Sequence, residues 1–263
     1  MREHAIPCAP FRVVENQEDL RSAVEALGMP CVLKNAGFGY DGKGQFRIRD
    51  LSQLDAAWNS SDVRERVLEG WIDYEREISV LVARTADGQA TTWDAFENQH
   101  RDGILDVTIY PARIRSDIAA AARDLALNVA ERMDVVGLLC VELFVGRDGA
   151  LLVNETAPRP HNSGHLTIEA SLTDQFEQQA HITADLPLGS TALRQPAAMV
   201  NLLGDVWSNG EPRWERSACD AGCLVASLWE NRTSPRPQNG PHHSAWPIPR
   251  ITRRLRRSKR VAA

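Results

Sequence analysis

Two glutamates flank the dipeptide Asp-Gly at 148–149, and their spacing is suited to binding a metal ion. Asp-Gly in a two-residue type I′ turn pairs Arg147 with Ala150, and counting outward sets Glu142 opposite Glu155. Opposed like charges on one sheet face are destabilising unless a cation lies between them. Magnesium prefers carboxylate oxygens, so the spacing predicts a magnesium site. The alternative is a solvated pair on an exposed face.

A glycine-rich stretch at 37–45 is the second chemical signal. Its four glycines in nine residues give a backbone that turns tightly and offers N–H groups to phosphate oxygens. Lys34, at the end of the preceding strand, would add a positive charge. The stretch matches neither common glycine-rich nucleotide motif. A glycine-rich hairpin with a surface lysine is therefore the alternative.

The elements that position these residues begin with a helix. Asn16 can cap it, Leu20, Val24 and Leu27 recur along one face, and Gly28 ends it before a strand at 31–33. We expect further strands near 46–49, 66–72, 77–83, 135–145 and 150–154, and one running toward 96. Helices are expected near 51–59, 116–132 and 173–184. This order lacks strict βαβ alternation, so it predicts an α+β fold with antiparallel sheets.

Charge is unevenly distributed along the 263 residues. The segment 231–263 holds nine Lys and Arg residues and no acids, leaving 21 basic against 35 acidic residues, a net charge of −14, in 1–230. An acidic body argues against nucleic acid as the main partner. No stretch approaches the roughly 20 apolar residues of a membrane span, and no secretory signal is visible, so we expect a cytoplasmic protein without a membrane partner.

The five cysteines are odd in number and mostly lie in apolar stretches, which favours reduced core thiols over a disulfide framework. Cys219 and Cys223 could bind zinc together with His242 and His243. Their spacing matches no familiar zinc pattern, which favours unrelated residues in a loose segment.

Several ordered blocks, spread over about residues 5 to 215, closely resemble the 5-(carboxyamino)imidazole ribonucleotide synthases of the ATP-grasp superfamily. The Tyr-Asp glycine loop and the Ala-Pro-Arg-x-His-Asn-Ser-Gly-His block are specific to this family within the superfamily. The matching blocks are Ile6–Phe11, Val32–Lys34, Gly39–Gln45, Glu97–Leu105, Asn154–His165 and Asn201–Asp205.

The resemblance implies an ATP-grasp fold, in which two α+β lobes with antiparallel sheets grip ATP. It implies a first lobe at 1–75, a second at 76–190, and a small, incomplete β-rich domain at 191–230. The basic, proline-rich segment 231–263 is expected to be a disordered tail or an out-of-frame product. The implied reaction uses ATP, Mg²⁺ or Mn²⁺, and bicarbonate to carboxylate 5-aminoimidazole ribonucleotide in purine biosynthesis, in a homodimer.

The resemblance also implies roles for residues at matching positions. Catalytic roles fall to Lys34, Arg159, His161 and His165, and metal binding to Glu142 and Glu155. The ribonucleotide or bicarbonate would contact Tyr40, Asp41, Arg159, His161, Asn162 and Ser163. ATP would contact Lys34, Gly39, Tyr40, Asp41, Gly42, Lys43, Gly44, Gln45, Glu69, Gly70, Trp71, Ile72, Glu77, His100, Asn154 and Glu155.

Two departures from the family pattern qualify the implied activity. The family carries a Rossmann-like domain ahead of the block that begins at Ile6, so we expect a version extended upstream to be far more active. Lysines that the family carries beyond Ser217 have no counterpart here. The alternatives are a catalytically impaired ATP-binding fragment and another ATP-grasp ligase, and the Tyr40-Asp41 loop disfavours the second.

Overall fold

The computed structural model describes residues 4–36, 44–63 and 65–202, together with the backbone of strands 223–229 and 242–247. The chain divides into two compact units, each built from several segments. Unit 1 comprises 1–75, 101–104 and 144–154, and unit 2 comprises 76–100, 105–143 and 155–263. Among the described residues, no helix is long and apolar enough to cross a membrane.

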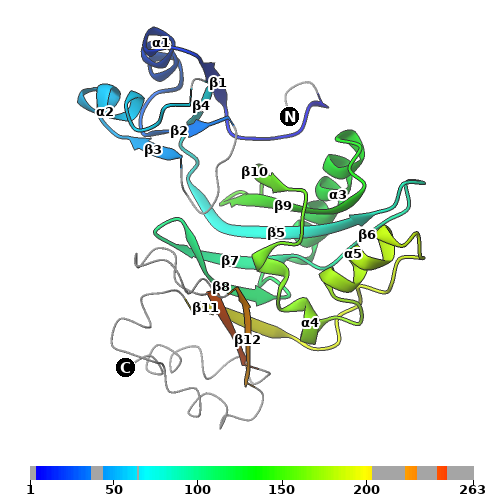
Figure 1. Ribbon diagram of the computed structural model, residues 1–263. Coiled ribbons are helices and arrows are strands. Elements are labelled where there is room, and N and C mark those ends of the chain that lie inside the picture. Colours follow the sequence, from blue (N-terminus) through cyan, green and yellow to red (C-terminus); the bar gives the residue numbers. More distant parts are fainter. Residues whose placement is uncertain (1–3, 37–43, 64, 203–222, 230–241, 248–263) are drawn as a thin grey trace. The chain divides into compact units, whose positions relative to one another are not determined.

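Unit 1 contains a four-stranded antiparallel sheet in the order β1-β4-β2-β3, with two helices that pack on it (Figure 1). As predicted, the Asn16 side chain caps the first helix by accepting from the Asp19 N–H, and Gly28 ends it. The elements are β1 (Phe11–Val14), α1 (Gln17–Leu27), β2 (Cys31–Asn35), β3 (Gln45–Ile48), η2 (Leu51–Gln53), α2 (Leu54–Trp58) and β4 (Arg66–Gly70).

The core of this sheet is drawn entirely from residues 14–68. Leu20 and Val24 of α1 and Leu54 of α2 are buried against Leu33 and Leu68 of the strands. The 3.6-residue period of α1 places its apolar residues on the face that meets the sheet. The helix therefore forms where its periodicity predicts it.

The second sheet has nine strands, in the order β10-β9-β5-β7-β8-β11-β13-β12 with β6 beside β5. Its strands are β5 (Tyr74–Arg84), β6 (Ala90–Thr92), β7 (Phe96–Arg101), β8 (Ile104–Tyr110), β9 (Gly137–Gly146), β10 (Leu151–Ala157), β11 (Ala197–Leu202), β12 (Cys223–Trp229) and β13 (His242–Pro247). The pairs β5–β7, β8–β11 and β11–β13 are antiparallel. The predicted α+β class with antiparallel sheets is confirmed.

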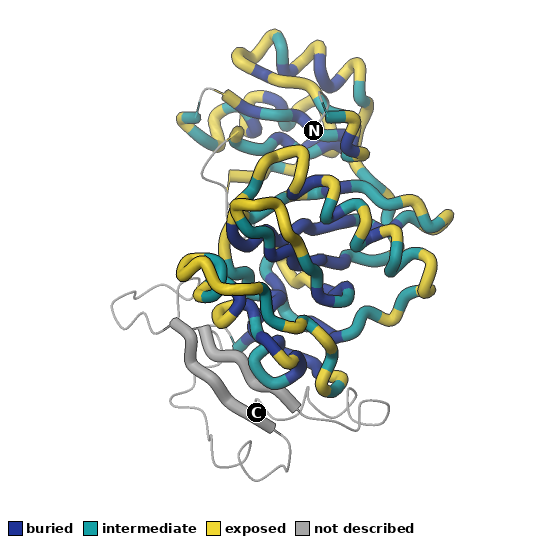
Figure 2. The backbone as a smooth tube through the Cα atoms, turned by 90° about the vertical axis from the view of Figure 1, so that its right-hand side faces the viewer, coloured by how far each residue is buried: buried dark blue, intermediate teal, exposed yellow. Residues whose placement is uncertain are grey.

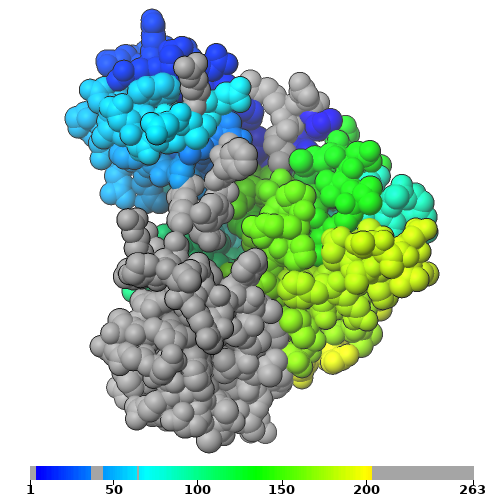
Figure 3. Space-filling model, viewed as in Figure 1, coloured from blue at the N-terminus to red at the C-terminus, as the bar shows by residue number. Residues whose placement is uncertain are grey.

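The helices of unit 2 are α3 (Ser116–Arg132), α4 (Thr167–Ala170) and α5 (Gln175–Thr183), with the short turn η3 (Asn162–Gly164) ahead of α4. Buried residues run through the interior of this unit (Figure 2), and β5 and β9 are buried along more than half of their length. Leu81, Phe96 and Leu138 pack with Leu166 and Ala170 in one cluster. Side chains in the green and yellow parts of the chain, well after residue 100, make up much of the surface of this unit in the view of Figure 3.

Candidate functional site

In unit 1, Lys34 lies between a carboxylate and an amide oxygen. Its Nζ atom is 2.7 Å from Glu69 Oε2 and 3.2 Å from Asn154 Oδ1. Lys34 is on β2 and Glu69 on β4, at diagonal positions on one face, because Val32 pairs with Glu69. About a fifth of each side chain is exposed, 19% for Lys34 and 22% for Glu69. The ammonium group is thus fixed in place and still open to a ligand.

The predicted glycine loop is described only at its end, because Gly39, Tyr40, Asp41, Gly42 and Lys43 lie outside the described residues. Gly44 has φ +77°, and its carbonyl accepts a 3.0 Å hydrogen bond from the Asn35 N–H. A Cβ at Gly44 would lie 2.6 Å from Asn35 Nδ2, so this position requires glycine. Gln45 then begins β3, opposite Lys34.

The segment that ends β4 contains three further predicted nucleotide contacts. The Gly70 N–H donates to the Pro10 carbonyl at 2.8 Å. The Trp71 side chain is partly exposed and lies under the Arg47 guanidinium, 4.3 Å from the ring centroid. Ile72 follows Trp71 directly. This segment presents an aromatic surface whose orientation Arg47 stabilises.

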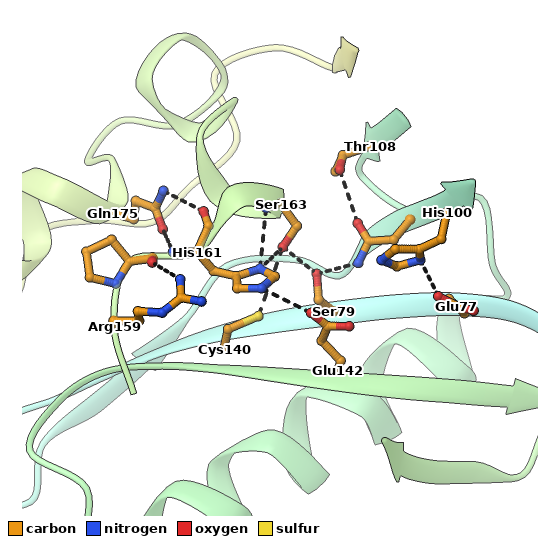
Figure 4. Close-up of polar contacts among 12 residues, drawn as sticks. Glu77, Ser79, His100, Thr108, Cys140, Glu142, Arg159, His161, Ser163 and Gln175 are labelled. Carbon is orange, nitrogen blue, oxygen red and sulfur yellow. Dashed lines mark hydrogen bonds and ion pairs between the residues drawn. The ribbon is translucent and has the colours of Figure 1, made fainter. Parts of the chain in front are cut away.

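In unit 2, polar side chains gather on one face of the nine-stranded sheet. Alternate residues of a strand project to the same face, so Glu77 and Ser79 of β5 share a face, as do Cys140 and Glu142 of β9. Strand β7 contributes Asn98, which pairs with Glu77 in the ladder. In Figure 4, Ser79, Cys140 and Glu142 point toward His161 and Ser163, and Glu77 points toward His100.

His161 and Glu142 form the centre of this polar face. His161 Nε2 lies 3.0 Å from Glu142 Oε1, and the two side chains are only 13% and 12% exposed. Burial raises the pKa of Glu142, but the hydrogen bond and charge of His161, with the charges of His100 and Arg159, lower it overall. Burial lowers the pKa of His161, but Cys140 and Glu142 raise it well above its usual value. An ionised carboxylate beside an imidazolium follows.

A buried chain of hydrogen bonds supports the other ring nitrogen of His161 (Figure 4). His161 Nδ1 is 2.9 Å from Ser163 Oγ, which is 2.8 Å from Ser79 Oγ. Asn98 Nδ2 donates to Ser79 Oγ at 2.9 Å, and Thr108 Oγ1 donates to Asn98 Oδ1 at 3.2 Å. These groups come from β5, β7, β8 and η3, so three strands determine the direction of one imidazole ring.

His100 joins the same face through Glu77, with which it forms an ion pair. Burial lowers the pKa of His100, but the hydrogen bond and charge of Glu77 raise it overall, with smaller contributions from Glu142 and Glu155. Both predicted metal ligands therefore lie within electrostatic range of one imidazole. The structure brings His100, Glu142 and Glu155 together from separate parts of the sequence.

The predicted two-residue turn at 148–149 is wrong. The Gly146 N–H donates to the Ala150 carbonyl and the Gly149 N–H to the Gly146 carbonyl, so the turn has three residues and pairs Gly146 with Ala150. Gly149 has φ +85°, and Asp148 Oδ1 accepts from the Ala150 N–H. In a regular ladder this one-residue shift sets Glu142 opposite Asn154, so simple counting does not place Glu142 opposite Glu155.

The remaining predicted residues lie around η3. Arg159 donates to the carbonyl of Pro160 at 3.0 Å and acts on Glu142 through its charge. The Asn162 carbonyl accepts from the His165 N–H at 3.1 Å. His165 is nearly buried, and its ring stacks on Phe176 with centroids 5.8 Å apart. The His165 side chain is therefore directed toward helix α5, which carries Phe176.

Sequence reasoning missed Gln175, a fully buried residue that holds the main chain of His161. Gln175 Oε1 accepts from the His161 N–H and Nε2 donates to the His161 carbonyl, both at 2.9 Å. Ser79, Asn98 and Cys140 were also missed as parts of the site. Asn98 lies in the matching block Glu97–Leu105, and this was the sequence signal that could have identified it.

Cys8, Cys31 and Cys140 are free thiols, as predicted for them.

Comparison with known proteins identifies the family of the fold. The ATP-grasp domain family matches residues 1–176. The chain is 45% identical over 197 residues to an N5-carboxyaminoimidazole ribonucleotide synthase of Bacillus subtilis strain 168, covering 75% of this chain and 52% of that protein. The chain thus spans about half the length of the curated relatives that it matches.

Solved structures agree with this assignment. The crystal structure of an N5-carboxyaminoimidazole ribonucleotide synthetase in complex with ADP has a TM-score of 0.84 and 37% identity, covering 93% of this chain and 63% of that one. An Aspergillus clavatus N5-carboxyaminoimidazole synthase, in complex with ADP and 5-aminoimidazole ribonucleotide, has a TM-score of 0.81 and 26% identity, covering 93% and 64%. Both neighbours are nucleotide complexes.

Proposed function

Since the chain belongs to the ATP-grasp family, we propose that it performs the reaction of the N5-carboxyaminoimidazole ribonucleotide synthases to which it is similar. ATP phosphorylates bicarbonate, giving ADP and carboxyphosphate. The carboxyl group then passes to the amine of 5-aminoimidazole ribonucleotide, and phosphate leaves. The product, N5-carboxyaminoimidazole ribonucleotide, belongs to purine biosynthesis.

One observation carries this proposal. His100, Glu142, Glu155 and His161 come from three separate stretches of the sequence, yet His100 interacts electrostatically with both glutamates, and Glu142 pairs with His161. The central pair, Glu142 and His161, is nearly buried. Burying charged groups is costly, and clusters of such groups mark functional sites. His100, Glu155 and His161 lie in blocks that match the family, and the resemblance also implies a metal-binding role for Glu142.

The nucleotide contacts follow from unit 1 and from His100. Lys34 would bind the phosphates, because Glu69 and Asn154 already fix its ammonium group and no reorganisation is needed when negative charge develops. The loop Gly39–Gln45 would supply backbone N–H groups. The segment from Glu69 to Ile72 would contact the adenine, and Glu77, oriented by His100, would accept hydrogen bonds from the ribose.

The donor groups on the polar face fit a magnesium ion. Glu142 is a nearly buried carboxylate whose pKa is lowered, and both Glu142 and Glu155 act on His100, so two carboxylate ligands are present in its neighbourhood. Glu142 and Glu155 would hold Mg²⁺ or Mn²⁺. Bound there, the ion would neutralise charge on the transferring phosphoryl group.

The substrate contacts would come from the segment around η3 and from the glycine loop. Arg159 is exposed and can bind an anionic oxygen of bicarbonate or carboxyphosphate. His161 would donate to the same anion from a ring held by Ser163 and Glu142. Tyr40, Asp41 and Asn162 would contact the ribonucleotide, and His165 would support the segment from its buried position.

We also propose that the active protein is a homodimer, as the resemblance implies. Light scattering coupled to size-exclusion chromatography would give the mass of the species directly. A mass of one chain at concentrations that support turnover would contradict this part of the proposal and leave the reaction unaffected.

The test of function is phosphate release from ATP, with and without 5-aminoimidazole ribonucleotide and bicarbonate. We expect ribonucleotide-dependent release in the wild type and a loss of about 10²-fold or more in Glu155→Ala, the size of effect expected when transition-state charge loses its partner. Glu131→Ala, on the exposed side of α3, is the matched control and should retain the wild-type rate.

Each other outcome has a distinct meaning. Release that does not depend on the ribonucleotide would contradict the proposed substrate and favour another ATP-grasp ligase. ATP binding without any turnover would favour a nucleotide-binding fragment. Equal rates in Glu155→Ala and wild type would contradict the metal-binding role of Glu155.

A further inference from the structure

A sulfur ligand lies beside the proposed magnesium ligand. Cys140 and Glu142 project from the same face of β9, and His161 lies over both (Figure 4). One ligand atom from each of these three residues lies within 4.8 Å of the other two. Cys140 is fully buried, whereas the side chains of Glu142 and His161 are slightly exposed. The cluster is therefore compact, and two of its three ligands keep slight access to solvent.

The ligand types select a particular class of cation. A thiolate, an imidazole and a carboxylate are the ligands of zinc, at about 2.3, 2.0 and 2.1 Å. Magnesium takes oxygen ligands and has little affinity for sulfur. Bond lengths of that size in a tetrahedron separate ligand atoms by roughly 3.3 to 3.8 Å. The observed separations, all within 4.8 Å, exceed this range by at most about 1.5 Å.

The surroundings of His161 resemble those of a metal-binding histidine. The nitrogen that faces Glu142 is Nε2, while Nδ1 lies 2.9 Å from Ser163 Oγ. A hydrogen bond at the second ring nitrogen orients the ring and fixes which nitrogen is available to a metal. Ser163 is itself held by Ser79, and Gln175 holds the main chain. The imidazole is thus preorganised for a ligand at Nε2.

We propose that Cys140, Glu142 and His161 form a binding site for a thiolate-preferring divalent cation of the zinc class. Three protein ligands leave a fourth position open to water. Binding would release the thiol proton of Cys140 and the proton on Nε2 of His161, and it would withdraw Glu142 and His161 from their other partners. Inhibition of turnover follows, and this consequence rests on the proposed function. Binding itself does not depend on it.

The test of binding uses Co²⁺ as a spectroscopic probe on the full chain without nucleotide. A thiolate-bound tetrahedral cobalt ion gives near-ultraviolet charge-transfer absorption and intense visible bands, and one equivalent of Zn²⁺ should remove both. We expect Cys140→Ser to lose the charge-transfer absorption. Cys31→Ser, a buried cysteine in the core of unit 1, is the matched control and should retain it.

A second control addresses the other cysteines. The double variant Cys219→Ser/Cys223→Ser should keep the absorption if the site is at Cys140. Absorption that disappears only in this double variant, or that survives in Cys140→Ser, would overturn the proposal. The absence of any charge-transfer absorption in the wild type would overturn it as well.

Two further measurements keep the proposal testable if Cys140→Ser does not fold. Ser163→Ala leaves all three ligands in place and should weaken Zn²⁺ binding about 10-fold to 100-fold in competition with a chromophoric chelator. Unchanged affinity would contradict the assigned orientation of His161. For turnover, Zn²⁺ should inhibit the wild type far more than Cys140→Ser, each relative to its own zinc-free rate. A bound cobalt signature with no turnover would contradict the proposed function while leaving the metal site intact.

Discussion

His161 is held by contacts on both ring nitrogens and on both main-chain polar groups. Glu142 and Ser163 contact the ring, and Gln175 contacts the N–H and the carbonyl. Buried polar groups that are fully paired are rigid, because any movement leaves a donor or acceptor unsatisfied. We therefore expect function at this histidine to depend on residues that touch no substrate.

Lys34 offers the clearest test at the scale of one residue. Lys34→Met removes the charge and preserves most of the side-chain volume. We expect ATP affinity to fall at least tenfold, because a preorganised charge on the phosphates is lost. The free energy of unfolding should change by less than about 1 kcal/mol, since partly exposed ion pairs contribute little. Calorimetric titration with ATP and urea unfolding measure the two quantities.

Arg21→Met, on the exposed face of α1, controls for the loss of one positive charge. It should leave ATP affinity unchanged. Equal affinity in Lys34→Met and the wild type would remove Lys34 from the phosphate site and leave it as a structural partner of Glu69.

At the scale of one element, helix α5 uses glutamines to hold three separate segments. Gln175 bonds to both main-chain groups of His161, and Gln178 bonds in the same way to Gly189, at 2.8 and 3.0 Å. Gln179 accepts from the Leu138 N–H at the start of β9. The helix thus positions the site segment, the return toward β11 and the strand that carries Glu142.

The two fully buried glutamines make a matched pair of mutations. Gln175→Leu and Gln178→Leu each leave one N–H and one carbonyl without their side-chain partner, so both should lower the free energy of unfolding by about 1–3 kcal/mol or more. Only Gln175→Leu should also impair ribonucleotide-dependent phosphate release, because only it frees His161. Urea unfolding and turnover assays at a temperature where both variants are folded measure this. Equal turnover would show that His161 needs no support from α5.

Strand β7 carries a pH-dependent contribution to stability. Glu97 is buried and accepts from the main chain and guanidinium of Arg113, while Arg76 lies at 3.2 Å. Burial raises the pKa of Glu97, but these partners lower it overall from 4.5. A carboxyl group with a lowered folded-state pKa stabilises the fold fully above its unfolded-state pKa, and that stability is lost as the pH falls through the folded-state value.

We therefore expect Glu97→Gln to cost about 1–3 kcal/mol near pH 7 and progressively less below about pH 4.5. Urea unfolding of both proteins between about pH 3.5 and pH 7 gives the difference in the free energy of unfolding at each pH. Gln99→Ala, on the exposed side of the same strand, should show a difference that does not vary with pH. A constant cost for Glu97→Gln would contradict the assigned charge state.

Local sequence predicted the elements better than it predicted their contacts. The cap at Asn16 and the helix at 116–132 could be read from short-range patterns, because caps and helical faces involve near neighbours. The turn at 147–149 was misread because the Asp148 side chain bonds to Ala150 and favours a longer turn. The bond between Ser79 and Ser163 joins residues 84 positions apart, and no local spacing reveals such a pair.

At the scale of the whole molecule, the first sheet has a core of its own. All ten buried residues of its cluster fall between Val14 and Leu68, and its four strands and two helices fall between Phe11 and Gly70. A core that is local in sequence can form without long-range pairing. We infer that residues 1–75 are a folding unit of limited stability, as expected for a domain of this size.

A fragment of residues 1–75 should show a cooperative thermal transition and slow amide exchange at Leu33 and Leu68. Its free energy of unfolding should be only a few kcal/mol, because so small a core rarely supplies more. Leu68→Ala in the fragment should abolish the transition, since losing a buried leucine costs about 2–5 kcal/mol. Circular dichroism and hydrogen exchange would show this, and a non-cooperative melt of the wild-type fragment would contradict it.

One of the two partners of Lys34 lies far outside this folding unit in the sequence. Asn154, whose amide oxygen contacts the lysine, lies 120 residues later, and the neighbouring Val153 N–H donates to the carbonyl of Pro7. On the ribosome, the first sheet can therefore fold long before Asn154 has been synthesised. The nascent chain would carry a folded sheet with an incomplete lysine environment, and competence to bind nucleotide would be a late event of translation.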